Sequence, residues 1–371
     1  MKYVGMDVSS KSFVVHALDE KRQVLKREEI EPTRAALRKL CAELGEEAKL
    51  IAFEAGNQMK WIADTLKKQE GVKIHVVHPN EVKWIAQSGG KKTDQVDAKK
   101  LAELARSDML PRAVHVVEGP TRQMRELVSA RTTLMQERVS LINTVRSYLK
   151  QEGVQLSEKF FGQENWKEQL GQKKLSATLK VIIEAFRPVI EALEKSESEL
   201  IDELKKLKDK RTELLETIPG IGVIASRTVV SALDDAKRFD NRKCVANYSA
   251  LAPTVYQSGS ELQMGRINRD GRQEVRRVML QCAHSLVRAK SPASQPLRDF
   301  YHRVEQRRGK KKALVALARK LLTICYGVLK SGKGFDPSKV EAKAKAKQQG
   351  FQQEKKADGA RTHRYVLRTV A

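Results

Sequence analysis

The sequence has few cysteines, no long hydrophobic run and far fewer acidic than basic residues. Its four cysteines, Cys41, Cys244, Cys282 and Cys325, lie far apart and form no CxxC pair. That spacing excludes a zinc knuckle and favours reduced thiols in a cytosolic protein. No segment approaches the ~20 apolar residues of a membrane span, and no signal-peptide pattern precedes Asp7. We therefore expect a cytoplasmic protein with no membrane partner.

The shortage of acidic residues gives the chain a large positive charge. Its 71 lysines and arginines exceed its 46 aspartates and glutamates by 25, which favours a polyanionic partner and excludes an acidic, substrate-mimicking surface. The excess is uneven, because residues 1–111 hold 20 basic and 17 acidic side chains whereas residues 301–371 hold 19 and 5. The nearly neutral first third therefore needs an explanation other than simple polyanion binding.

Hydropathy patterns divide the 371 residues into four segments. Residues 1–112 alternate short strand and helix patterns, which predicts a mixed α/β domain that starts with three antiparallel strands. Residues 118–210 hold two long helical segments, and residues 211–332 form a second globular unit rich in helix. Residues 333–371 form a basic tail that we expect to be mobile. The predicted fold class is α/β followed by a mainly α region.

The two long helical segments carry apolar residues at seven-residue intervals. One series contains Leu127, Leu134, Leu141 and Tyr148, and another contains Leu193 and Leu200. Pro188 is expected to kink the second helix. Such seams are typical of a coiled coil that joins protomers into a dimer or tetramer, and also of a helical hairpin or bundle within one chain. The sequence leaves these alternatives open.

Four carboxylates in the first segment form a candidate metal site. Asp7 lies at the end of the first predicted strand, and Glu54 ends a later, buried strand. Asp94 and Asp97 are three residues apart and share a helix face. If the strands are neighbours, the four carboxylates converge and need a divalent cation to offset their repulsion. Oxygen ligands select Mg²⁺ or Mn²⁺, two of which can hold the reacting oxygens of a phosphodiester. Singly, each carboxylate is more often a cap or surface charge, and Asp97 could pair with Lys100.

A glycine-containing turn in the second globular unit reads as a helix–hairpin–helix. It runs Leu-Glu-Thr-Ile-Pro-Gly-Ile-Gly over residues 215–222. Gly220 and Gly222 would let the hairpin backbone approach a phosphate, and the following helix would offer free N–H groups. An ordinary turn between helices is the alternative. We take both glycines as candidate nucleic-acid-binding residues.

A glycine- and arginine-rich stretch beyond this turn has the character of an anion site. It contains Tyr256-Gln257-Ser258-Gly259-Ser260, then Met264-Gly265-Arg266-Ile267-Asn268-Arg269-Asp270-Gly271, then Arg276-Arg277. The candidate nucleic-acid-binding residues are its arginines, Arg266, Arg269, Arg276 and Arg277. A serine beside such a site can attack a phosphodiester if its proton is removed and the developing charge is stabilised. A serine in a glycine-rich loop is more often a turn residue.

Together these motifs resemble a known family. Gly5-Met6-Asp7-Val8-Ser9, Phe53-Glu54-Ala55 and Lys92-Thr93-Asp94-Gln95-Val96-Asp97-Ala98 look like the DEDD signature of transposases of the insertion-sequence family numbered one hundred and ten, and of the related Piv-type DNA invertases. The resemblance implies an N-terminal domain with an RNase H-like, RuvC-like fold. It also implies a C-terminal transposase domain whose Ser-Gly dipeptide carries the nucleophile. By position that residue is Ser258, and Ser260 is a rival because the sequence reads Ser-Gly-Ser.

The function that the resemblance implies is a recombinase that cuts and rejoins DNA. It would form a serine–phosphate intermediate, assisted by metal on the four carboxylates, and would act as an oligomer in a bacterial or archaeal cell, near the nucleoid. Insertion-sequence members use a structured guide RNA that pairs with donor and target DNA. The alternatives are a Piv-type invertase without guide RNA, a metal-dependent junction nuclease and a non-catalytic nucleic-acid-binding protein. The serine domain argues against the nuclease, and the intact carboxylates argue against a decayed site.

Overall fold

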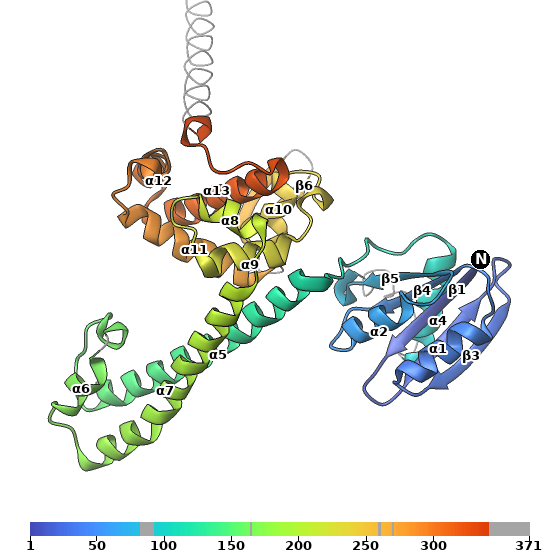
Figure 1. The fold of residues 1–371 in the computed structure, drawn as a ribbon, viewed down its shortest axis with the longest axis horizontal. Helices are drawn as coiled ribbons and strands as arrows, with labels where there is room; N and C mark the ends of the chain where they lie inside the picture. Colours follow the sequence, from blue (N-terminus) through green and yellow to red (C-terminus); the bar gives the residue numbers. More distant parts are fainter. Residues whose placement is uncertain (82–92, 164, 259–260, 269–270, 341–371) are drawn as a thin grey trace, which may run out of the picture. The chain divides into compact units, whose positions relative to one another are not determined.

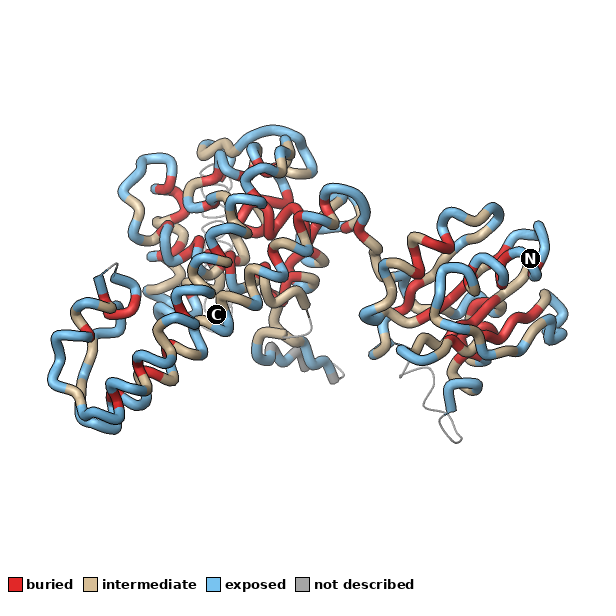
Figure 2. The backbone as a smooth tube through the Cα atoms, turned by 60° about the horizontal axis from the view of Figure 1, so that its bottom comes forward, coloured by how far each residue is buried: buried red, intermediate tan, exposed pale blue. Residues whose placement is uncertain are grey.

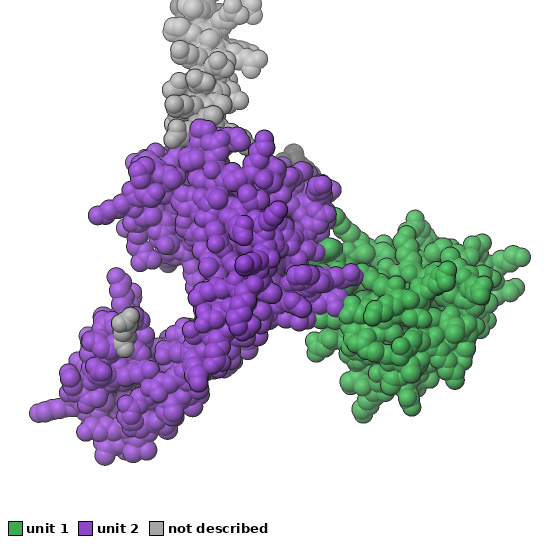
Figure 3. Space-filling model, in the orientation of Figure 1, with its two compact units in different colours: residues 1–117 green, residues 118–371 purple. Residues whose placement is uncertain are grey.

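The computed structural model divides the chain into two compact units. They comprise Met1–Val117 and Glu118–Ala371 and have different colours in Figure 3. The structure describes residues 1–81, 93–163, 165–258, 261–268 and 271–340. Ser260, Arg269 and the part of the predicted mobile tail from residue 341 onward lie outside the described residues.

The first unit is built on a five-stranded mixed sheet (Figure 1). Its strands are β1 (Lys2–Val8), β2 (Phe13–Leu18), β3 (Val24–Ile30), β4 (Lys49–Glu54) and β5 (Val72–Val77), and its helices include α1 (Arg34–Glu43), α2 (Met59–Leu66) and α4 (Asp94–Arg106). The strand order is β3-β2-β1-β4-β5. The strands β1, β2 and β3 pair antiparallel, whereas β4 runs parallel to both β1 and β5. The predicted mixed α/β domain is confirmed.

The central strands are buried on both faces because helices cover both sides of the sheet. Met6 and Phe53 belong to a core that also contains residues of α1 and α2. Ala52, one residue before Phe53, belongs to a separate apolar cluster with Leu101 and Ala105 of α4. Side chains alternate between the faces of a strand, so α4 covers the face opposite to that of α1 and α2.

Gly5 sets how closely α4 approaches the sheet. A Cβ atom on Gly5 would overlap the carbonyl oxygen of Ala98 and lie 2.5 Å from the amide nitrogen of Ala102. Glycine inside a strand often marks such a close backbone approach. The backbone of α4 therefore lies directly on β1, and no larger residue fits between them.

We expect Gly5→Ala to destabilise the first unit by about 3 kcal/mol or more, because the added methyl group must push α4 off the sheet. Hydrogen exchange of the α4 amides in the full chain measures the effect. Gly56→Ala is the matched control: a Cβ there would meet no atom of the described residues within 4 Å, so a change within about 0.5 kcal/mol is expected. Equal protection of α4 in the two variants would contradict the packing described here.

The second unit begins with a helical hairpin inside one chain. Its two long helices, α5 (Gly119–Gln151) and α7 (Ala177–Lys206), pack along each other, and η1 (Phe160–Gly162) and α6 (Trp166–Gly171) lie between them in sequence. An apolar cluster joins these four elements and includes Ile142, Leu149, Trp166 and Ile183. The long helices therefore bury their seams against each other, as in the hairpin alternative. Oligomer formation stays a prediction.

The buried seam of α7 differs from the predicted one. Ile183, Ile190, Glu197 and Leu204 are buried at seven-residue intervals, whereas the predicted seam residues Leu193 and Leu200 are only half-buried. The helix also continues through Pro188.

The shift has an electrostatic cause at Glu197. Its carboxylate lies 2.8 Å from Nε of Arg138 and 3.5 Å from a guanidinium nitrogen of Arg131, both on α5. Two arginines on one carboxylate let a charged residue occupy an otherwise apolar seam.

The rest of the second unit is mainly helical, as predicted. Its elements are α8 (Lys210–Glu216), α9 (Val223–Leu233), η2 (Ala236–Arg238), α10 (Arg242–Tyr248), β6 (Pro253–Ser258), β7 (Glu261–Ile267), α11 (Gln273–Arg288), η3 (Pro292–Ser294), α12 (Gln295–Arg308) and α13 (Lys310–Ser331). Every residue of α9 from Ala225 to Leu233 is buried, and many of these residues belong to the large apolar core of this unit. Buried residues are red in Figure 2. Among the described residues, we find no helix with the length and apolar character of a membrane span.

Candidate functional site

Asp7 and Glu54 lie at the same end of two neighbouring parallel strands. The register of β1 and β4 pairs Gly5 with Ala52 and Met6 with Phe53, so the next step along both strands places Asp7 beside Glu54. Parallel neighbours are ~4.8 Å apart and residues in register point to the same face. Both half-buried carboxylates therefore lie on the face that α4 covers, as predicted from their positions at the strand ends.

Asp94 and Asp97 occupy the first turn of α4, where the side chain of Thr93 caps the helix by accepting from the amide of Val96. The direction of α4 follows from Arg22, in the turn after β2, which donates to Glu103 at 2.7 Å. This contact places the second half of α4 near the start of β1. The first turn of α4 therefore points toward the end of β1, where Asp7 lies.

The four carboxylates thus share one end of the sheet, but they do not form a closed ligand set. Among the described residues, no three histidine, cysteine, aspartate or glutamate side chains form a group that could hold a metal ion. Asp94 is exposed and Asp97 half-buried at the helix start. The donor chemistry fits a hard cation, because all four groups offer carboxylate oxygens. The structure brings the predicted residues to one place without the ligating distances.

A buried histidine lies under α4, beside this site. His16 on β2 is opposite Gly5 in the register and is 5% exposed, and its Nε2 atom has no hydrogen-bond partner among the described residues. Burial, together with the nearby charges of Lys99 and Arg27, lowers the pKa of His16, and Glu103 opposes this only in part. The neutral imidazole is therefore the form that fits under the helix. Sequence reasoning missed this residue, whose only signal was a histidine inside an apolar strand.

The lowered pKa of His16 predicts a pH-dependent stability of the first unit. The unfolded chain binds this proton more readily than the folded one, so stability rises with pH between the lowered folded pKa and the ordinary value near 6.5. We expect His16→Leu to remove this rise, measured by hydrogen exchange of the sheet amides between pH 5 and 7.5. The exposed His78 gives the control His78→Leu, which should keep the rise. An unchanged pH profile in His16→Leu would contradict the assignment.

The predicted serine lies at the end of a two-stranded hairpin in the second unit. Ser258 is the last residue of β6 and pairs with Glu261 of β7. Next to the base of the hairpin, Thr254 donates its hydroxyl to the carbonyl oxygen of Arg266 at 3.0 Å. Arg266 is exposed, so one predicted cation is on the same hairpin as Ser258.

The other predicted arginines of this stretch lie on α11. Arg276 is half-buried, and the guanidinium of Arg277 faces the side-chain amide of Gln136 on α5. Arg277 also lines a pocket of about 430 Å³ with Arg131 and Glu274. Arg277 therefore helps to pack α11 against α5.

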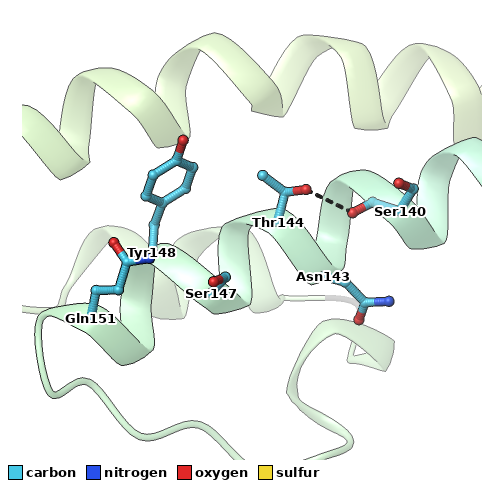
Figure 4. Close-up of a pocket in the computed structure, with 6 residues that line it drawn as sticks. All are labelled: Ser140, Asn143, Thr144, Ser147, Tyr148 and Gln151. Atoms are coloured by element: carbon cyan, nitrogen blue, oxygen red, sulfur yellow. Dashed lines mark hydrogen bonds between the residues drawn. The ribbon is translucent and has the colours of Figure 1, made fainter.

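A second pocket, of about 470 Å³, follows one face of α5 and was not foreseen from the sequence. It is lined by Ser140, Asn143, Thr144, Ser147, Tyr148 and Gln151 (Figure 4). Thr144 donates to the carbonyl oxygen of Ser140 at 3.1 Å. The lining carries no acidic or basic side chain, so it offers nothing that would neutralise a phosphate.

The glycine turn joins α8 to α9, and Gly220 in this turn packs closely against another helix of the chain. It has a φ of +85°, and a Cβ there would lie 3.2 Å from the carbonyl oxygen of Cys282 and 3.4 Å from Cβ of Leu286. Both belong to α11, so the close approach of Gly220 is to this chain's own helix. Gly222 is different, because it is exposed, is the N-cap residue before α9, and would place a Cβ within 4 Å of no described atom. Of the two glycines, Gly222 has the free approach that a phosphate requires.

A cluster of arginines around Tyr248 fixes the segment that leads into the hairpin. Arg272 donates to the Tyr248 hydroxyl at 3.4 Å, and the guanidinium of Arg238 lies 4.7 Å from the ring centre. Although burial opposes the shift, Arg272, Arg238 and Arg125 lower the pKa of Tyr248. Arg125 and Arg238 also donate to carbonyl oxygens at the end of α9. The cluster therefore holds α9, α10 and the start of α11 together.

Two protein-family models match the two parts of the chain that hold these residues. The DEDD transposase model for IS110, described as a transposase, matches residues 4–153, which include all four carboxylates. The model described as transposase of the IS116/IS110/IS902 family matches residues 212–301, which include Ser258 and the predicted arginines.

Similar proteins include DNA-inverting and transposing proteins. The pilin gene-inverting protein of Moraxella bovis is 36% identical over 128 residues, which cover 34% of this chain and 39% of that protein. The transposase for insertion sequence element IS1111A of Coxiella burnetii is 23% identical over 89% of this chain and 90% of its own length. The transposase for IS1328 of Yersinia enterocolitica is 23% identical, with coverages of 90% and 98%. The match to the inverting protein is thus partial, whereas both transposases align over nearly their full length.

Proposed function

The chain belongs to the IS110 family of transposases, and from this membership we propose that it is a DNA transposase, a recombinase that cuts and rejoins DNA strands. One observation carries the proposal. The two transposase models match the two segments that hold the carboxylate end of the sheet and the Ser258 hairpin. The full-length alignment with the IS1111A and IS1328 transposases supports it.

We propose that Asp7, Glu54, Asp94 and Asp97 hold Mg²⁺ or Mn²⁺ in a domain with an RNase H-like, RuvC-like fold. The mixed sheet and the common position of the carboxylates support this assignment. A bound divalent ion would stabilise negative charge on the phosphate and its leaving oxygen. The chain itself sets the geometry, because the contact of Gly5 with α4 holds the helix start at the strand ends.

We propose that Ser258 is the nucleophile. Its oxygen loses its proton and bonds to phosphorus while the bond from phosphorus to one strand's oxygen breaks, and that oxygen leaves as a hydroxyl after taking up a proton. Attack on the serine–phosphate by the hydroxyl of another strand reverses these steps and rejoins the DNA. An arginine of the same stretch, either Arg266 or Arg269, can balance the added negative charge in the transition state. Arg266 is exposed on the same hairpin as Ser258.

We further propose that the protein acts as a dimer or tetramer in the cytoplasm, at the nucleoid, with donor and target DNA and a structured guide RNA. The net charge of +25 is large enough for the protein to bind RNA as well as DNA. A second candidate is a site-specific invertase of the Piv type that needs no RNA, which the 36% identity to a pilin gene-inverting protein favours.

Two measurements on the purified full chain test these proposals. The first is sequencing of co-purified nucleic acid after selective digestion: a discrete RNA supports the guided transposase, and its absence in an active preparation supports the invertase. The second is recombination of a plasmid that carries the DNA flanking the gene, with Mg²⁺ or with EDTA. Failure to cut or rejoin that DNA under any condition would contradict the recombinase proposal, and full activity in EDTA would contradict the metal site alone.

A further inference from the structure

The β6–β7 hairpin exposes a large aromatic side chain to solvent. Tyr256 is 66% exposed and its neighbour Val255 is 55% exposed. Among the described residues, β6 and β7 form a separate two-stranded sheet. Water solvates an aromatic ring poorly, so covering the ring with another flat or apolar surface is favourable. This exposed ring is therefore a feature that a ligand would explain.

Gly265 holds the Tyr256 ring in place. A Cβ at Gly265 would overlap the hydroxyl oxygen of Thr254 and lie 3.0 Å from Cε2 of Tyr256. The ring therefore lies against the Gly265 backbone on the neighbouring strand, in space that a side chain would fill. This contact restrains the ring in the free protein. It therefore reduces the conformational entropy that the side chain loses when a ligand binds. It also gives a physical reason for a glycine at this point of the motif.

The position of Tyr256 relates it to the proposed chemistry. Ser258 follows two residues later on the same strand, which is about 6.6 Å along a strand. Successive bases on one DNA strand are about 3.4 Å apart. A nucleotide within one or two steps of a phosphate held at the end of β6 can therefore bring its base to the Tyr256 ring.

The chemistry around Tyr256 favours a nucleobase over a protein side chain as its ligand. Arg266 on the partner strand is exposed. The hairpin therefore presents an exposed aromatic ring on one strand and an exposed cation on the other. Proteins that bind single-stranded nucleic acid combine such features, because bases stack on aromatic rings and cations contact the backbone. Bases inside a duplex already stack on each other, so only an unpaired base offers a free face.

We propose that Tyr256 is a stacking platform for an unpaired DNA base beside the phosphate that is cut. Tyr256 positions the strand and takes no part in bond making. The inference rests on the proposed function for the location of the cut, whereas base binding by the ring can be measured without strand exchange.

The test uses the full chain and a single-stranded oligonucleotide that carries 2-aminopurine, whose fluorescence falls when it stacks. We expect Tyr256→Ala to weaken binding about 5- to 150-fold and to remove the quenching, whereas Tyr256→Phe keeps both within about twofold. The matched control is Val255→Ala, which removes an exposed side chain from the same strand. An abasic nucleotide at the quenched position should cost the wild type the same factor and cost Tyr256→Ala nothing.

The outcomes separate this inference from the proposed function. Recombination by the wild type, with unchanged binding and quenching in Tyr256→Ala, would overturn the stacking role alone. Quenching by the wild type without any recombination would support base binding and count against the recombinase proposal. If Tyr256→Ala changes the oligomeric state and leaves oligonucleotide binding intact, the ring serves a protein contact and the inference is wrong.

Discussion

A protein carrying Ser258→Ala is expected to form no covalent adduct with DNA and to lose strand exchange by at least about three orders of magnitude. A loss of that size corresponds to roughly 4 kcal/mol of transition-state stabilisation. The methyl group of alanine cannot bond to phosphorus, so the bond energy that rejoining requires is not conserved. Hydrolysis by metal-activated water would break strands but would not rejoin them.

The measurement traps adducts on a nicked suicide substrate, in which the leaving strand diffuses away, and maps the modified peptide. Ser260→Ala is the matched control, because it removes the rival hydroxyl two residues along the chain. That variant should retain most of its strand exchange. An adduct on Ser260, or normal exchange by Ser258→Ala, would show that the assignment is wrong. Cleavage without any adduct would instead favour a metal-dependent nuclease.

The carboxylate end of the sheet was predictable because strands impose simple rules. Asp7 and Glu54 each lie at the end of a short apolar run, and such a run predicts a buried strand. Observed register places them side by side on one face. The placement of α4 was harder to predict from the sequence, although a glycine inside a strand, Gly5, indicates that another backbone approaches closely. Its significance depends on which element lies above it, which only the tertiary structure shows.

The seam of α7 was not predictable because it depends on a distant charge. Seven-residue periodicity correctly indicated two long helices, but several stripes of α7 carry apolar residues. The buried stripe contains Glu197, so a pattern of regularly spaced apolar residues does not predict it. Its burial depends on Arg131 and Arg138, more than fifty residues earlier on α5, and no local pattern contains that pairing.

The glycine turn shows the same limit of local sequence. Gly220 and Gly222 lie two residues apart in one motif, yet one packs on α11 and the other is open to solvent. The motif predicts the turn and its flanking helices but not which glycine a neighbouring helix approaches. The sequence does not single out Tyr256 for a related reason, because the exposure of an aromatic residue on a strand depends on which other elements cover that strand.

Replacing Asp7 by asparagine is expected to reduce strand cleavage by at least about two orders of magnitude while leaving the fold and DNA binding nearly intact. Asparagine keeps the shape of the side chain and removes the charge that a divalent cation requires. Asp94→Asn should behave in the same way, because it acts from the start of α4 on the same end of the sheet. A protein that stays fully active in EDTA, or that tolerates both changes, would show that these carboxylates hold no catalytic metal.

Stability gives the same test a readout that does not depend on catalysis. Each protein is compared with itself in EDTA, so the gain in stability on adding metal reports metal binding alone. With Mn²⁺ at a hundred times its dissociation constant, the wild type should gain about 2.7 kcal/mol and Asp7→Asn much less. Glu31→Gln removes an exposed carboxylate of the same unit and should gain as much as the wild type. Equal stabilisation of all three proteins would place the bound Mn²⁺ elsewhere, whereas a gain lost only in Asp7→Asn would link metal binding to the end of β1.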